Sequence, residues 1–74
     1  MPATHETSFT AFHKLSEMHP AFNKRGAYQI GTPDHELMLD FLALDAVASA
    51  KATGCKPRKA EQKRADAVVS RLGL

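Results

Sequence analysis

Apolar positions recur at helical spacing in three segments of the chain. In the first, within about residues 5 to 19, the apolar residues are Phe9, Phe12, Leu15 and Met18, with Ala11 beside them. Their near i, i+3 spacing predicts a helix with one apolar face. Thr7 or Ser8 is placed to cap its start, and Pro20 ends it because the residue before a proline avoids helical backbone angles.

The second segment carries the clearest helix start in the chain. Thr32 stands as N-cap, Pro33 follows at the first helical position, and two carboxylates lie in the first turn, where the helix dipole favours negative charge. We expect a helix over about 33–53 that ends at Gly54. Its apolar residues form two nearly opposite stripes: Leu37, Phe41, Leu44 and Ala48 on one side, and Leu39, Leu42, Ala43, Ala46 and Ala50 on the other. A helix with two apolar faces packs on both, so we place it centrally.

The third segment follows Pro57, which we place at the first helical position, and runs to about Leu72. Its apolar stripe is confined to the second half and consists of Ala65, Val68, Val69 and Leu72. The first half offers only Ala60. We therefore expect the start of this helix to project into solvent or toward a partner.

Residues 20–32 interrupt the helical pattern with Pro20, Gly26 and Gly31. We expect an ordered loop here, with one turn of helix over Pro20–Lys24. Three apolar side chains of the loop are expected to fill the core: Phe22, Tyr28 and Ile30.

These elements predict an all-α fold, a small three-helix domain with a long central helix. We expect the 74 residues to form a single helical domain, 1–74, with residues 1–5 flexible. A chain of this length buries only about 60% of the surface its unfolded form exposes, so its stability margin is thin. No apolar run approaches the roughly 20 residues that span a bilayer, and Met1–Ser8 lacks the features of a secretory signal. We expect a soluble, cytoplasmic protein without a membrane partner.

Cys55 is the single cysteine, so an internal disulfide and a cysteine-rich zinc framework are both excluded. One cysteine suits a reducing compartment. We interpret Cys55 as a small apolar residue in a turn. A reactive thiol is the alternative, because a basic setting near a helix N-terminus favours the thiolate.

Charge is unevenly distributed although the net charge is only +2. Residues 33–50 hold four carboxylates and no basic residue, Asp34, Glu36, Asp40 and Asp45, which we expect on exposed flanks of the central helix. Residues 51–64 hold one carboxylate, Glu61, and six cations: Lys51, Lys56, Arg58, Lys59, Lys63 and Arg64. We expect one end of the molecule to be basic and another acidic.

The basic segment 51–64 conflicts with local helix preferences. Cations in the first turn oppose the helix dipole by about 0.3 to 1 kcal/mol each when exposed. Lys59 and Lys63 also repel each other at i, i+4 spacing. A locally unfavourable feature in a marginally stable domain points to function. Three interpretations stay open: a solvated face that neutralises the acidic helix, a nucleic-acid contact, and a contact with an acidic protein.

The break between the second and third helices partly matches a helix-turn-helix. A small residue, a glycine four positions later and an apolar residue are supplied by Ala50, Gly54 and Cys55. The second helix of such a motif needs apolar contacts in its first half, however, and only Ala60 is available there. The first helix is also longer than such motifs use.

The sequence offers little for metal binding or catalysis. His5, His13, His19 and His35 form no metal-binding pair or motif, so we predict neither a metal site nor a cofactor. A chain of this size leaves little room for a water-excluding pocket, and the four glycines stand too far apart for a phosphate loop. We therefore do not expect an enzyme.

The leading hypothesis is a small non-enzymatic regulator. It would dock the basic segment, Lys51 to Arg64, on an acidic surface of a nucleic-acid-handling assembly. Small inhibitors of transcription or defence complexes, including those encoded by phages or plasmids, are of this size. Direct DNA or RNA binding by the same segment is one alternative. A homo-oligomeric structural protein is another, because a second copy could cover one face of the central helix.

Overall fold

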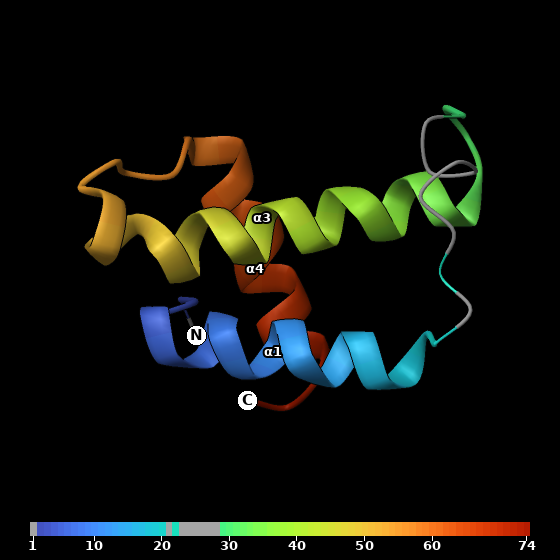
Figure 1. Ribbon diagram of the computed structural model, residues 1–74, viewed down its shortest axis with the longest axis horizontal. Coiled ribbons are helices and arrows are strands. Elements are labelled where there is room, and N and C mark those ends of the chain that lie inside the picture. The colour runs from blue at the N-terminus through green and yellow to red at the C-terminus, as the bar shows by residue number, and fades with distance from the viewer. Residues whose placement is uncertain (1, 21, 23–28) are drawn as a thin grey trace.

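The computed structural model describes residues 2–20, 22 and 29–74 as a three-helix, all-α domain (Figure 1). The helices are α1, His5–Met18, α3, Pro33–Thr53, and α4, Lys59–Arg71. This confirms the fold class and the long second helix.

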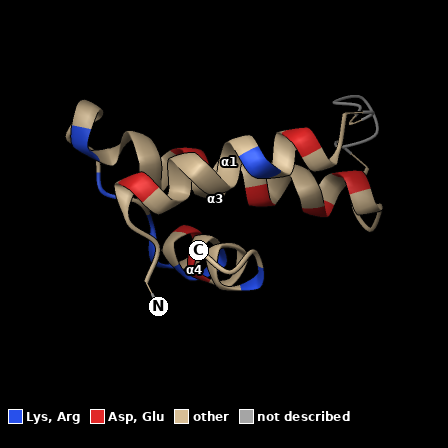
Figure 2. Cartoon of the chain, turned by 90° about the horizontal axis from the view of Figure 1, so that it is seen from below, with Lys and Arg blue, Asp and Glu red and all other residues tan. Residues whose placement is uncertain are grey.

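The helices form two layers. α1 and α3 lie side by side and run in opposite directions, and α4 crosses behind them steeply, so that Figure 2 shows it nearly end-on. Both α1 and α4 pack mainly against α3 and touch each other less. α3 is therefore the central helix, as predicted, although its second apolar stripe stays partly exposed at Leu42.

The start of α1 differs from the prediction. Its N-cap is Thr4, whose hydroxyl accepts the backbone N–H of Thr7 at 3.1 Å. The Thr7 hydroxyl in turn accepts the backbone N–H of Thr4 at 2.8 Å. Thr7 is thus the third residue of the helix and the partner in a capping box, and Ser8 lies deeper still. The expected cap at Thr7 or Ser8 was wrong, since the helix begins three to four positions earlier.

The buried face of α1 is made of smaller residues than expected. Ser8, Ala11 and Leu15 are buried, whereas Phe9 is 57% and Met18 54% exposed. Small side chains let the helix approach its neighbours closely, and larger ones at Ser8 or Ala11 would hold it away.

Phe12 lies at the border of this face. It is partly buried and meets Phe41 edge-on, with ring centroids 5.1 Å apart. Such an edge-to-face arrangement is favourable for aromatic rings.

The limits of α3 are those the sequence predicts. Thr32 accepts the backbone N–H of His35 at 3.1 Å, and Pro33 is the first helical residue. Gly54 ends the helix with φ of 72°, a left-handed conformation that glycine adopts without steric cost. Its N–H donates to the carbonyl of Ala50 at 2.9 Å.

The buried positions of α3 are Asp40, Ala43, Leu44 and Val47. Two parts of the stripe prediction were wrong: Leu42 is 53% exposed, and Asp40, expected on an exposed flank, is only 8% exposed. Asp40 is buried because arginines of α4 reach it, as described below.

α4 begins two residues later than Pro57, with Arg58 as N-cap. The Glu61 carboxylate accepts the backbone N–H of Arg58 at 3.0 Å. Ala65, Val68 and Val69 are buried and Leu72 packs partly against the core. The prediction that only the second half of this helix carries the apolar stripe is confirmed.

The chain before α1 is fastened to α4, although the sequence suggests flexibility over residues 1–5. Ala3 is buried, its N–H donates to Asp66 at 2.5 Å, and its carbonyl accepts the Gln62 amide at 3.1 Å. His5 already belongs to α1 and its Nδ1 donates to the carbonyl of Ala48.

The loop fills the core less than expected. Phe22 is half-buried and packs on Phe41 with ring centroids 5.3 Å apart. Ile30 is 89% exposed, so its expected place in the core was wrong. Tyr28 and most of the predicted turn over Pro20–Lys24 lie outside the described residues.

Candidate docking surface

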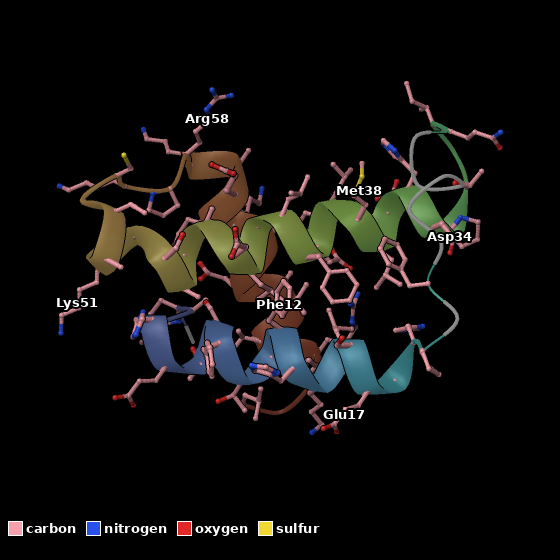
Figure 3. The ribbon with its side chains drawn as sticks, in the orientation of Figure 1. Phe12, Glu17, Asp34, Met38, Lys51 and Arg58 are labelled. Carbon is pink, nitrogen blue, oxygen red and sulfur yellow. The ribbon has the colours of Figure 1, made fainter. Side chains whose placement is uncertain are left out.

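The junction of α3 and α4 forms one end of the molecule. α3 finishes at Thr53, residues 54–58 connect the helices without regular structure, and α4 starts at Lys59. In Figure 3, Lys51 and Arg58 extend from this end into solvent. The turn of the chain therefore gathers cations that are up to twelve positions apart in sequence.

Five of the six predicted site residues share this environment. We call them the basic end: Lys51, Lys56, Arg58, Lys59 and Lys63, all exposed. Within the described part of the chain, none of them forms an ion pair with a carboxylate. The carboxylate of the nearby Glu61 accepts the backbone N–H of Arg58 and pairs with none of these cations. The basic end thus keeps its positive charge uncompensated.

Arg64, the sixth predicted residue, lies apart from the basic end. Its Nε donates to Asp40 at 2.8 Å and its Nη2 donates to the carboxylate of Glu36 at 2.5 Å and to the carbonyl of Glu36 at 3.1 Å. Burial alone would lower the pKa of Arg64, but its hydrogen bonds with the two carboxylates and their negative charge raise the pKa above its ordinary value. Arg64 is therefore a residue that holds α4 to α3.

Arg71 joins Arg64, Glu36 and Asp40 in one cluster of charged side chains, the arginine cluster. Sequence reasoning did not single out Arg71. Its Nη2 donates to the other carboxylate oxygen of Asp40 at 3.3 Å. Asp40 thereby receives one arginine from the middle of α4 and one from its last turn. The signal in the sequence was seven-residue spacing, which puts Arg64 and Arg71 on one face of α4.

The acidic helix is consequently not a uniformly acidic surface. Glu36 and Asp40 are neutralised by arginines of α4, which leaves Asp34 and Asp45 without an ion pair among the described residues. Neutralisation of the acidic helix, one of the three interpretations of segment 51–64, describes Arg64. It does not describe the other five cations.

Asp66 is a second carboxylate on α4 with a structural partner. The backbone N–H of Ala3 and, next, the Gln62 amide at 2.7 Å lower the pKa of Asp66 below its ordinary value, although burial opposes this. No ion pair joins Asp66 to Lys63 among the described residues, although the two stand at i, i+3 spacing.

Cys55 lies exposed in the connection between α3 and α4, and its N–H donates to the Thr53 hydroxyl at 3.3 Å. The described residues contain no group of three or more histidine, cysteine or carboxylate side chains placed to hold a metal ion. The histidines have separate surroundings: His5 bonds the backbone of α3, and His13 lies edge-on to Phe9.

The comparison with a helix-turn-helix can be tested on the packing. The steep crossing of α3 and α4 and the left-handed Gly54 resemble that motif. Yet every buried residue of α4 lies at or after position 65, and Ala60 is exposed. The first half of α4 is thus held by Arg64 and Gln62 and not by an apolar contact.

The fold and surface define a small helical domain whose cationic end forms no ion pair within the part of the chain that the structure describes. Searches for a matching protein family, curated protein or solved structure found none. Among the described residues, no helix combines the length and apolar character needed to cross a membrane.

Proposed function

We propose that this protein is a small non-enzymatic regulator whose basic end docks on an acidic protein surface within a nucleic-acid-handling assembly. The observation that carries the proposal is a division among the cations at the start of α4. Arg64 is paired with two carboxylates, while Lys56, Arg58, Lys59 and Lys63 are exposed and form no ion pair with the described residues.

The unpaired cations cost stability locally. Arg58 is the N-cap of α4 and Lys59 its first residue, where positive charge opposes the helix dipole. Lys63 stands one turn further on and repels Lys59. The fold itself gains nothing from these three side chains in the described contacts, which supports a role outside the fold.

The chemistry of the surface favours a charged macromolecular partner. The basic end carries no large apolar side chain, since the apolar residues between its cations are the small Ala52, Cys55, Pro57 and Ala60. Its attraction is therefore electrostatic and long-ranged. A nucleic-acid-handling assembly fits because it can present acidic protein surfaces next to phosphate backbones.

The larger of the two hollows described in this structure supports a binding role over catalysis. The larger one is an open groove of about 520 Å³, and Asp45 is the only ionisable residue among its described lining. A single exposed carboxylate provides no acid–base pair and no activated nucleophile.

Direct binding of DNA or RNA is the second candidate. It is favoured by the outer face of α4, which begins with Lys59 and Lys63 and continues with the small exposed residues Ala67 and Ser70. A helix with such a face can approach a phosphate backbone closely.

The test compares two variants with the same change in net charge. R58Q/K59Q/K63Q removes three cations from the basic end. T10E/Q29E/I30E adds three negative charges at exposed positions on α1 and before α3. Immobilised wild type and both variants are used to capture proteins from nuclease-treated lysate of the native host, and the captured protein is then purified and titrated.

We expect the wild type and T10E/Q29E/I30E to bind the same acidic protein, and R58Q/K59Q/K63Q to lose it while its helical circular dichroism is unchanged or stronger. Equal binding by R58Q/K59Q/K63Q would refute the proposal, as would loss of its helical signal. For the second candidate, affinity for a labelled duplex or single strand should fall linearly on a log–log salt plot. No retention on either nucleic acid at low salt would reject it.

A further inference from the structure

A second surface lies on the face of the α1–α3 layer that α4 does not cover. On α3, Leu42 and Asp45 stand about 200° and 140° around the helix from Asp40, which faces α4. Figure 3 shows Phe12 between α1 and α3, with α4 behind it, and Met38 further along α3, away from α4. This face is therefore solvent-facing in the isolated chain.

An open apolar groove of about 520 Å³ follows this face. Its described apolar lining comprises Phe12, Phe22, Met38, Phe41 and Leu42. Leu42 of α3 is 53% exposed. Phe9, on the same side of α1 as Phe12, is 57% exposed. Large apolar side chains gathered in one exposed groove are typical of a binding site for an apolar helix face.

Two aspartates of α3 lie in or beside the described part of the groove. Asp45 belongs to its described lining, and an adjoining hollow of about 240 Å³, which shares Phe22 with the groove, is lined by Asp34 and His19. Neither hollow has a lysine or arginine among its described lining residues. Asp34 and Asp45 are eleven positions apart on α3, about 16 Å along the axis, and neither is paired with a described cation.

We infer that this groove binds a basic amphipathic helix of a protein partner. The apolar stripe of that helix would fill the groove between Phe12 and Leu42, and its lysine or arginine side chains would pair with Asp45 and Asp34. This surface is distinct from the basic end, so the inference does not depend on the proposed function.

A second copy of this chain fits the groove poorly. Two copies joined groove to groove would bring acidic faces together, which opposes association. The basic end of another copy has the complementary charge but lacks large apolar side chains to fill the groove. Charge and shape together thus select a helix that is both basic and apolar.

The probe is a labelled helical peptide of about 18 residues, long enough to span both aspartates. It carries leucines along one stripe and lysines beside them. Its matched control keeps the leucines and replaces every lysine with glutamate. Fluorescence anisotropy measures binding to the full-length protein, and backbone amide NMR shifts locate the contact.

We expect the basic peptide to bind about tenfold or more tightly than the acidic one and to shift the amide signals of Met38 and Leu42. L42S should weaken binding about fivefold, and D45N about two- to fivefold. The matched controls I30S and E17Q change an exposed apolar residue and an exposed carboxylate outside the groove and should leave binding unchanged. R58Q/K59Q/K63Q should also keep binding, which separates this site from the basic end.

Any of four results would overturn the inference. One is no binding of the basic peptide at about 1 mM. Another is equal binding of the two peptides, and a third is wild-type affinity in both L42S and D45N. The fourth is a wild-type dimer in sedimentation that L42S dissociates, because a second copy would then occupy the groove.

Discussion

Leu42 and Leu44 are the same side chain two positions apart on α3, yet their surroundings differ. Leu44 is fully buried and Leu42 is 53% exposed. We expect L44A to lower the free energy of unfolding by about 2 to 5 kcal/mol, because it leaves a cavity in the core, and L42A to lower it by less than about 1 kcal/mol. Urea unfolding followed by circular dichroism measures both. Similar losses for the two variants would contradict the assignment of the core.

Asp40 is the residue whose role sequence reasoning missed most clearly. Its side chain is 12% exposed and accepts hydrogen bonds from Arg64 and Arg71, which are 34% and 61% exposed. Because the arginines stay partly solvated, we expect D40A to lower the free energy of unfolding by about 1 to 3 kcal/mol, less than a fully buried pair would lose.

The matched control for Asp40 is Asp45, an exposed carboxylate of the same helix without an ion pair among the described residues. D45A should change the free energy of unfolding by no more than about 0.5 kcal/mol. The urea midpoints of the two variants give the comparison. A D40A midpoint equal to that of wild type would show that the arginine cluster is not stabilising.

At the scale of elements, the sequence predicted what local chemistry determines. The α3 limits follow from Thr32, Pro33 and Gly54, which act on the backbone within one turn of their own positions. The exposure of Phe9 and Ile30 could not be predicted in this way, since it depends on where a distant helix packs. The same holds for Asp40, whose partners on α4 are 24 and 31 positions away.

The candidate site likewise contains residues that local sequence predicted and others whose surroundings depend on tertiary packing. Position in the sequence indicated the basic segment, and the exposure of Lys51, Lys59 and Lys63 agrees with it. Periodicity alone could not separate Arg64 from these residues, because the distinction lies in carboxylates contributed by α3. The apolar groove was likewise unpredicted, since its walls come from two helices and Phe22.

The attachment of the N-terminal segment to α4 predicts a pH dependence. Asp66 has a pKa lowered chiefly by the N–H of Ala3 and then by Gln62. A carboxylate with a lowered folded-state pKa stabilises the fold above its unfolded value, about 3.9, and this contribution is lost as pH falls through the folded value. D66N should therefore be less stable than wild type near pH 6 and lose less stability between about pH 4 and pH 2.

Urea midpoints at several pH values measure this difference, with D45N as the control. Asp45 has no side-chain hydrogen bond of this kind in the described structure, so D45N should keep the wild-type acid dependence. If D66N and wild type lost stability in parallel on acidification, the contacts of Ala3 with Asp66 and Gln62 would not fasten the N-terminal segment in solution.

At the scale of the whole molecule, the charges serve two purposes at different places. Arg64 and Arg71 are paired with carboxylates of α3 and join the two layers. The cations of the basic end are exposed around the junction of α3 and α4 and form no ion pair with the described residues. A chain with a net charge of only +2 thus presents a concentrated positive surface without being strongly basic overall.

The exposed cations at the start of α4 are expected to lower the stability of the fold while they strengthen partner binding. Lys59 and Lys63 oppose the dipole at the start of α4 and repel each other, so K59Q/K63Q should raise the free energy of unfolding by about 0.5 to 1 kcal/mol at low salt. The gain should shrink at about 0.5 M salt, because exposed charges are then screened. Binding to the acidic partner should weaken in the same variant.

K51Q is the control because it makes the same chemical change at the opposite kind of helix end. Lys51 lies in the last turn of α3, where positive charge favours the dipole. K51Q should leave stability unchanged or lower it slightly while also weakening partner binding. Urea unfolding at two salt concentrations, with titration of the partner, resolves the pattern. A loss of stability in K59Q/K63Q would mean that Lys59 and Lys63 support the fold, and the start of α4 would then have a structural role.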